Sequence, residues 1–148
     1  MKNIIENWKI FLKEQNIAYS GVLLDDSSRE KLLSLQIPDG WEKIAHHMTI
    51  TMGPIVHPKG KHDFSSDYAV GSPVNLEVIA IGMSDKALAV KVKPPADISP
   101  KVKFPHVTIA VNREAGGKPF DSNKIPEENF KPLSGITLTG KVAEIPQK

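Results

Sequence analysis

The sequence predicts an α+β fold in which antiparallel strands form two small sheets with a central cleft between them, together with N-terminal helices. Three observations predict this fold. Short segments that alternate apolar and polar residues recur from position 17 to position 145, which is typical of antiparallel strands. Helical spacing of apolar residues is confined to the first 35 positions. One short motif occurs twice, which predicts a bilobal arrangement with pseudo-twofold symmetry.

The composition fits a single globular domain that spans positions 1–148, with 40% hydrophobic and 24% charged residues. Cysteine is absent, so the chain offers neither a disulfide framework nor a thiolate site. No apolar run approaches the roughly 20 residues that cross a bilayer, and no secretory signal is visible, so we expect a cytoplasmic protein without a membrane contact. The net charge of +2 favours a compact anionic ligand over duplex nucleic acid.

Two helices are expected near the N-terminus. Positions 3–15 place Ile5, Trp8 and Leu12 on one helical face, with charged residues between them. A strand is expected over positions 17–24. The second helix begins after it, where Ser27 and Glu30 have the spacing of a capping box, and Leu32, Leu33 and Leu35 supply its buried face.

The rest of the chain reads as strands and loops. Positions 75–83 and 87–93 predict a hairpin that exposes Glu77, Lys91 and Lys93, and positions 136–145 predict a final strand. Positions 53–73 are rich in glycine and proline and show no period, so we expect a long functional or mobile loop.

The repeated motif occupies positions 45–52 (Ala-His-His-Met-Thr-Ile-Thr-Met) and positions 105–111 (Pro-His-Val-Thr-Ile-Ala-Val). Both runs predict strands, in which residues two apart share a face. His47 therefore shares a face with Thr49, and His106 with Thr108. The opposite faces carry apolar residues for the core, and the first of them includes Met48, Ile50 and Met52. His46 points away from His47 in an ideal strand and is expected to be structural.

One copy of this motif is typical of an ordinary half-exposed strand face, so the inference depends on the repetition. Histidine is half-protonated near pH 6.5, which lets one imidazole act as a base while a second acts as an acid. Threonine hydroxyls can donate hydrogen bonds to the non-bridging oxygens of a phosphate. Neither motif has a carboxylate cluster beside it, so we expect no metal and no cofactor.

The pair His47-x-Thr49 and His106-x-Thr108 resembles the signature of the two-histidine (2H) phosphoesterase superfamily. That superfamily includes cyclic phosphodiesterase domains of RNA-processing enzymes and small phage proteins that destroy cyclic oligonucleotide signals of bacterial immunity (anti-CBASS phosphodiesterases). The resemblance implies a bilobal fold with one motif in each lobe. The segment between the two histidines is shorter than in larger members, which implies that a helix of the second lobe is missing.

Three functions are therefore expected, in this order. The first is a metal-independent phosphodiesterase that cleaves cyclic oligonucleotides, in the host cytoplasm if the chain is phage-encoded. The second is a 2′,3′-cyclic phosphodiesterase that acts on RNA ends. The third, of another class, is a protein that sequesters a nucleotide without turnover. The residues leave open which histidine is the base and which linkage is cleaved.

Further candidates for substrate binding are aromatic residues and one lysine. The aromatic candidates for stacking on a base are Tyr19, Trp41, Phe64 and Tyr68. A Gly-Gly turn at positions 116–117, beside Lys118, could offer backbone amides to a phosphate, although an ordinary surface loop is the more common alternative. Lys124, in the stretch that follows this turn, is the lysine candidate for substrate binding. His57, His62 and Asp63 match no standard metal-ligand spacing and predict a solvated loop.

Overall fold

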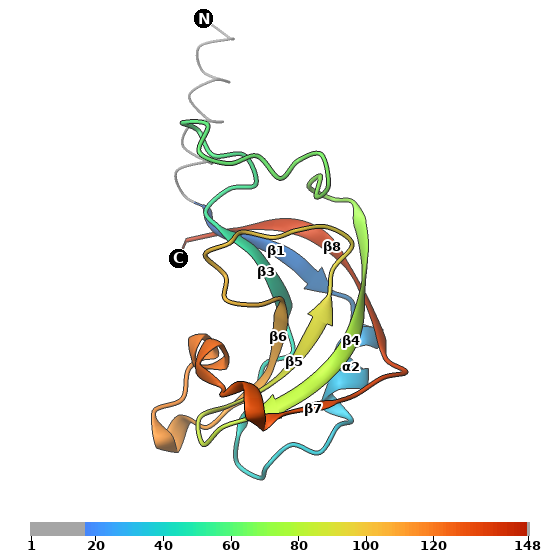
Figure 1. The fold of residues 1–148 in the computed structure, drawn as a ribbon, viewed down its shortest axis with the longest axis vertical. Coiled ribbons are helices and arrows are strands. Elements are labelled where there is room, and N and C mark those ends of the chain that lie inside the picture. The colour runs from blue at the N-terminus through green and yellow to red at the C-terminus, as the bar shows by residue number, and fades with distance from the viewer. Residues whose placement is uncertain (1–16, 148) are drawn as a thin grey trace, which may run out of the picture.

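The computed structural model describes residues 17–147, and its main feature is an antiparallel sheet (Figure 1). The expected helix over positions 3–15 lies outside the described residues. The strands are β1 (Ile17–Leu24), β2 (Glu42–Lys43), β3 (His47–Met52), β4 (Pro73–Met83), β5 (Ala87–Lys93), β6 (His106–Val111), β7 (Phe130–Pro132) and β8 (Thr137–Pro146). The helices are α2 (Asp26–Leu33) and three short 3₁₀ turns, η1 (Arg113–Ala115), η2 (Pro119–Lys124) and η3 (Glu127–Asn129).

Within the described residues the strands form one eight-stranded sheet, not two separate small sheets. Its main path runs β6, β3, β1, β8, β4 and β5, and β5 pairs with β6 again, so the sheet closes on itself in a barrel-like ring (Figure 1). The short strands β2 and β7 extend it beside β6 and β4. Every pairing is antiparallel, which confirms the predicted α+β class with antiparallel strands.

The closed sheet buries one side of each strand in a common core. The fully buried residues of this core come from all parts of the sheet and include Val22, Met48, Ile50, Leu76, Val90, Val107, Ile109 and Leu138. Helix α2 lies against β8 and adds Leu32 to the same cluster. The strands that carry the two motifs therefore have their apolar residues fixed in a tightly packed interior.

The start of α2 differs from the predicted capping box. The helix begins two residues earlier than the box requires, so Asp25 is the N-cap and its carboxylate accepts a hydrogen bond from the Ser28 amide (2.8 Å). Ser28 itself is buried, and its hydroxyl accepts a hydrogen bond from the Thr139 amide on β8 (2.7 Å). Within residues 17–147, no helix combines the length and apolar character needed to span a bilayer.

The predicted hairpin of β4 and β5 is confirmed, as are the strands over positions 17–24 and 136–145 to within one residue at each end. The exposed face predicted for this hairpin is wrong for Lys91, whose side chain is only 16% exposed. Its Nζ atom pairs with Glu127 and lies over the ring of Phe130, 4.4 Å from the centroid. Packing against this ring removes the lysine stem from solvent while its charge stays paired.

The register of β3 contains an irregularity that corrects another prediction. Thr51 pairs with Ser20 of β1, but the next β1 residue, Gly21, pairs with Thr49, so Ile50 is an extra residue on β3. Such a bulge reverses the alternation of faces beyond it. Thr51 is therefore buried, whereas Met52, predicted for the core, is 66% exposed.

The loop over positions 53–72 is anchored by Tyr68, which belongs to the core and is fully buried. Its hydroxyl donates a hydrogen bond to the Ala96 carbonyl (2.5 Å). The substitution Tyr68→Phe should lower the free energy of unfolding by about 1 kcal/mol, because it leaves this carbonyl without its partner. Urea denaturation of the wild type and the variant measures the difference, and equal midpoints with equal slopes would contradict the assignment.

Candidate active site

A cavity of about 740 Å³ lies where β1, β3 and β6 face the segments around positions 101–103 and 119–124. The charged and titratable residues on its wall, apart from Tyr19, are the histidines His46, His47 and His106 and the lysines Lys101, Lys103 and Lys124. Among the described residues, no carboxylate lines this cavity. A hollow with three lysines and no acidic side chain has the charge to receive an anion. Both predicted His-x-Thr pairs line it.

A two-residue bulge on the first motif determines how its histidines point. The Ala45 amide donates to the Thr108 carbonyl (3.0 Å), whereas Met48 is the next residue that pairs with β6, opposite Val107. His46 and His47 therefore have no counterparts on β6. The alternation expected of a strand is interrupted here, and both imidazoles line the cavity. The prediction that His46 points away from His47 as a structural residue is wrong for this reason.

The bulge is held from outside the sheet by an arginine of α2. Arg29 donates hydrogen bonds to the carbonyl oxygens of Ala45 (2.9 Å) and Ile44 (3.3 Å). Ala45 has a φ of 43°, in the left-handed region that is unfavourable for a residue with a Cβ atom. The guanidinium thus stabilises a backbone conformation that the local sequence would not choose alone.

His47 lies between two other rings. Its Nδ1 atom is 2.9 Å from Nδ1 of His46, and its ring stacks on Tyr19 with 4.6 Å between centroids. Burial of the ring, with smaller contributions from His46 and His106, lowers the pKa of His47 from 6.5 to about 4. Burial and the charge of Arg29 also lower the pKa of His46. Near neutral pH, His47 is therefore a neutral imidazole.

His106 is held by a different set of contacts. Its Nδ1 atom lies 2.8 Å from the Phe104 carbonyl oxygen. A carbonyl only accepts, so this contact requires a proton on Nδ1 and leaves Nε2 of the neutral ring as an acceptor. The Phe104 ring packs against both His106 and Phe130, and Lys91 lies over the two phenylalanine rings. Burial lowers the pKa of His106, and the hydrogen bond to Phe104 offsets part of that effect.

The two motif threonines are not equivalent. Thr49 is half-buried on the cavity wall. Thr108 is nearly buried, and its hydroxyl lies 2.7 Å from the Ser122 hydroxyl and 3.3 Å from the Pro119 carbonyl oxygen, to which it donates. Thr108 thus ties β6 to η2, so a ligand would have to compete with Pro119 for its single hydroxyl proton.

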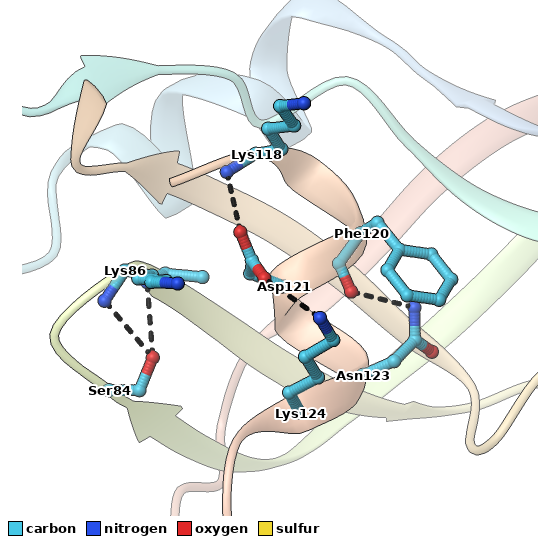
Figure 2. A network of polar contacts seen from close by, with 8 residues as sticks. Ser84, Lys86, Lys118, Phe120, Asp121, Asn123 and Lys124 are labelled. Atoms are coloured by element: carbon cyan, nitrogen blue, oxygen red, sulfur yellow. Dashed lines mark hydrogen bonds and ion pairs between the residues drawn. The ribbon is translucent and has the colours of Figure 1, made fainter. Parts of the chain in front are cut away.

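The short helix η2 carries part of the cavity wall. Figure 2 shows the polar contacts of this helix. Asp121 accepts a hydrogen bond from the Lys118 amide (2.8 Å) and pairs with Lys124 at 3.7 Å, and the Asn123 side chain donates to the Phe120 carbonyl (3.1 Å). These contacts fix the turn while the Phe120 ring stays 68% exposed. The exposed ring and Met52 give the cavity apolar surfaces besides its charges.

The Gly-Gly turn has no backbone amide to spare for a phosphate. The Gly116 and Gly117 amides donate to the carbonyls of Arg113 and Asn112, at 3.0 and 2.8 Å, and the Lys118 amide is taken by Asp121. The turn directly precedes η2, the short helix that carries Lys124, and the Lys124 side chain does line the cavity.

The structure brings together six of the nine residues predicted for the site, namely His47, Thr49, His106, Thr108, Tyr19 and Lys124. The other three lie elsewhere. Tyr68 is buried in the core, and Trp41 and Phe64 are partly buried against it. Additional lining residues missed by sequence reasoning are His46, Met52, Lys101, Lys103 and Phe120. The only signal for the lysines was their position just before the second motif.

The histidines of the long loop are engaged within the loop itself. The His57 Nδ1 atom accepts from the Lys59 amide (3.0 Å), and His62 Nε2 lies 2.8 Å from the Pro54 carbonyl oxygen. Across residues 17–147, no group of three or more His, Asp or Glu side chains is arranged to hold a metal ion.

The low pKa of His47 predicts a pH-dependent stability. Between about pH 6.5 and pH 4 the unfolded chain binds a proton at this residue and the folded protein does not. Its contribution is therefore complete above pH 6.5 and decreases on acidification, by up to about 1.4 kcal/mol per pH unit. Denaturant unfolding at several pH values should show that the free energy of unfolding changes less steeply with pH in His47→Gln than in the wild type. Identical slopes would contradict a buried neutral imidazole.

A scan of the chain against protein-family models finds no match, and a search among curated proteins finds no relative.

Proposed function

We propose that this chain is a metal-independent phosphodiesterase that cleaves small cyclic oligonucleotides, with His47 and His106 as its acid and base. The observation that carries the proposal is that both motif histidines, from adjacent strands β3 and β6, line one cavity that also holds three lysines and no carboxylate among the described residues. A phosphodiester is an anion whose cleavage requires two proton transfers, and these residues supply the charge and the proton carriers.

The chemistry proceeds by transfer of protons between the substrate and two imidazoles. One neutral ring takes the proton of the nucleophile, which is either a water molecule or a 2′-hydroxyl of the substrate. The second ring, which is protonated, gives its proton to the leaving oxygen. In the reverse reaction the acid and base roles of the two rings exchange. Lys101, Lys103 and the Thr49 hydroxyl offset the charge on the non-bridging oxygens.

The size and lining of the cavity favour a compact ligand. A volume of about 740 Å³ lies within the range of small-molecule sites. The exposed Phe120 ring and Met52 offer surfaces on which a base can pack, and Lys124 lies beside Phe120. These features favour a cyclic oligonucleotide over a 2′,3′-cyclic RNA end, which remains the alternative substrate.

The bilobal arrangement with pseudo-twofold symmetry implied by the 2H resemblance is part of this proposal. The antiparallel pairing of Met48 on β3 with Val107 on β6 supports this part of the proposal, because it sets equivalent positions of the two motifs opposite each other. We also propose action in the cytoplasm, in that of the host if the chain is phage-encoded.

Incubation with cyclic dinucleotides in excess EDTA tests the activity. The wild type should release product in the presence of the chelator, and His47→Ala and His106→Ala should each reduce kcat by a factor of about 10² to 10⁴, the usual contribution of general acid or base catalysis. His62→Ala, a histidine outside the cavity, is the matched control and should retain activity. A requirement for added metal would overturn the mechanism.

The same assay separates the alternatives. Tight binding of the cyclic dinucleotide without product would support a sequestering protein instead. Faster turnover of short RNAs that end in a 2′,3′-cyclic phosphate would support the RNA-end enzyme.

The pH dependence of the reaction follows from the lowered pKa values of both histidines. The plot of kcat/KM against pH should be bell-shaped with its maximum on the acidic side of pH 6.5, because above that pH the protonated imidazole becomes scarce. A bound phosphodiester anion raises both pKa values, so the maximum of kcat should lie at a higher pH. Steady-state rates from pH 4 to pH 9 provide the measurement, and a flat profile would exclude a two-histidine mechanism.

A further inference from the structure

We propose that His46 is a positioning residue that shares one proton with His47 through their Nδ1 atoms. The tautomer of His46 thereby determines whether Nδ1 or Nε2 of His47 carries the proton. This inference rests on the proposed function for its catalytic consequence, but the shared proton is a property of the protein without substrate. It adds a third histidine to a site for which the repeated motif predicts two.

The first step is the distance between the two rings. Two imidazole nitrogens 2.9 Å apart form a hydrogen bond only if one of them carries a proton and the other does not. A neutral imidazole carries one proton, so the two neutral rings must be opposite tautomers. When His47 has its proton on Nδ1, its Nε2 atom is a base, and His46 has its own proton on Nε2.

The second step is that the contact is built into the backbone. His46 and His47 are adjacent in sequence, and adjacent residues of a regular strand point to opposite faces. Only the bulge between Ala45 and Met48 brings both rings to the cavity, and Arg29 of α2 holds that bulge. Ala45, a non-glycine residue next to the cavity-lining His46, has a strained φ, and strained backbone of this kind is concentrated at functional sites.

The third step is the difference in surroundings. The groups near the pair from neighbouring elements are Arg29 of α2, Tyr19 of β1, His106 of β6 and the lysines Lys101 and Lys103 of the cavity wall. His47 is stacked on Tyr19 and is the more deeply buried of the two rings, which opposes a positive charge on it.

The proton then has a defined path. Nε2 of His47 accepts the proton of the nucleophile, and the proton on Nδ1 of His47 moves to Nδ1 of His46. His47 becomes neutral with its proton on Nε2, and His46 becomes the imidazolium. Return of the proton to Nδ1 of His47 lets Nε2 release its proton to solvent, while the leaving group takes its proton from His106. No proton is gained or lost overall, and the charge lies on the less buried ring.

The test of the shared proton uses nuclear magnetic resonance of the wild-type protein with ¹⁵N-labelled histidine at pH 7.5, without substrate. We expect the ring nitrogen shifts to show His46 and His47 in opposite tautomers, with a proton on only one of the two Nδ1 atoms. Spectra in which both rings carry their proton on Nε2 would overturn the proposal. This measurement is independent of turnover, so it stands even if no phosphodiester is cleaved and the proposed function fails.

The test of the positioning role uses His46→Asn and His46→Ala, with His62→Asn as the matched control outside the cavity. Asparagine keeps a hydrogen-bonding atom near the position of Nδ1 but cannot carry the charge. We expect both His46 variants to lose on the order of tenfold or more in kcat/KM and the acidic limb of the pH profile to move to higher pH, because the charge of His46 no longer lowers the pKa of His47. Full activity and an unchanged profile in His46→Asn would overturn the relay. If circular dichroism shows that either variant does not fold, the tautomers measured in the wild type still test whether the two rings share a proton.

Discussion

The arrangement of this site depends on the change of register between the first motif and β6. Before the bulge Ala45 is bonded to Thr108, and after it Met48 pairs with Val107. The insertion of His46 and His47 between these points directs two imidazoles into the same hollow. Arg29 stabilises the strained backbone, so a helix on the outside of the sheet controls the geometry inside the cavity. Removal of that support would leave the composition of the wall unchanged and the positions of its rings undefined.

The two copies of the motif share letters but differ in surroundings. His106 bonds to a backbone carbonyl, which fixes one tautomer, whereas His47 lies 2.9 Å from another titratable ring, so that the two neutral rings take opposite tautomers. Thr108 of the second copy is tied to η2 through Ser122, whereas Thr49, its counterpart in the first copy, is half-buried on the cavity wall. The two copies of the motif therefore carry the same side chains, but the neighbouring elements give these side chains different hydrogen-bond partners.

The antiparallel strands and the shared face of each His-x-Thr pair could be predicted, because strand alternation and the repeated spacing are local properties of the chain. The bulges could not, because they are set by pairing with other strands: one brought His46 into the cavity and another exposed Met52. The closure of the sheet is likewise a long-range property. Aromatic character alone misdirected the choice of stacking residues, since Tyr68 serves the core whereas the exposed ring is Phe120.

The cavity wall is divided between strands and connecting segments. The motif histidines and threonines lie on β3 and β6, whereas Lys101, Lys103 and Phe120 lie on the segments that border them. Connecting segments tolerate substitution and insertion far better than strands of a closed sheet. The lining of the cavity can thus diverge through changes in these segments while the histidines and threonines on the strands are preserved.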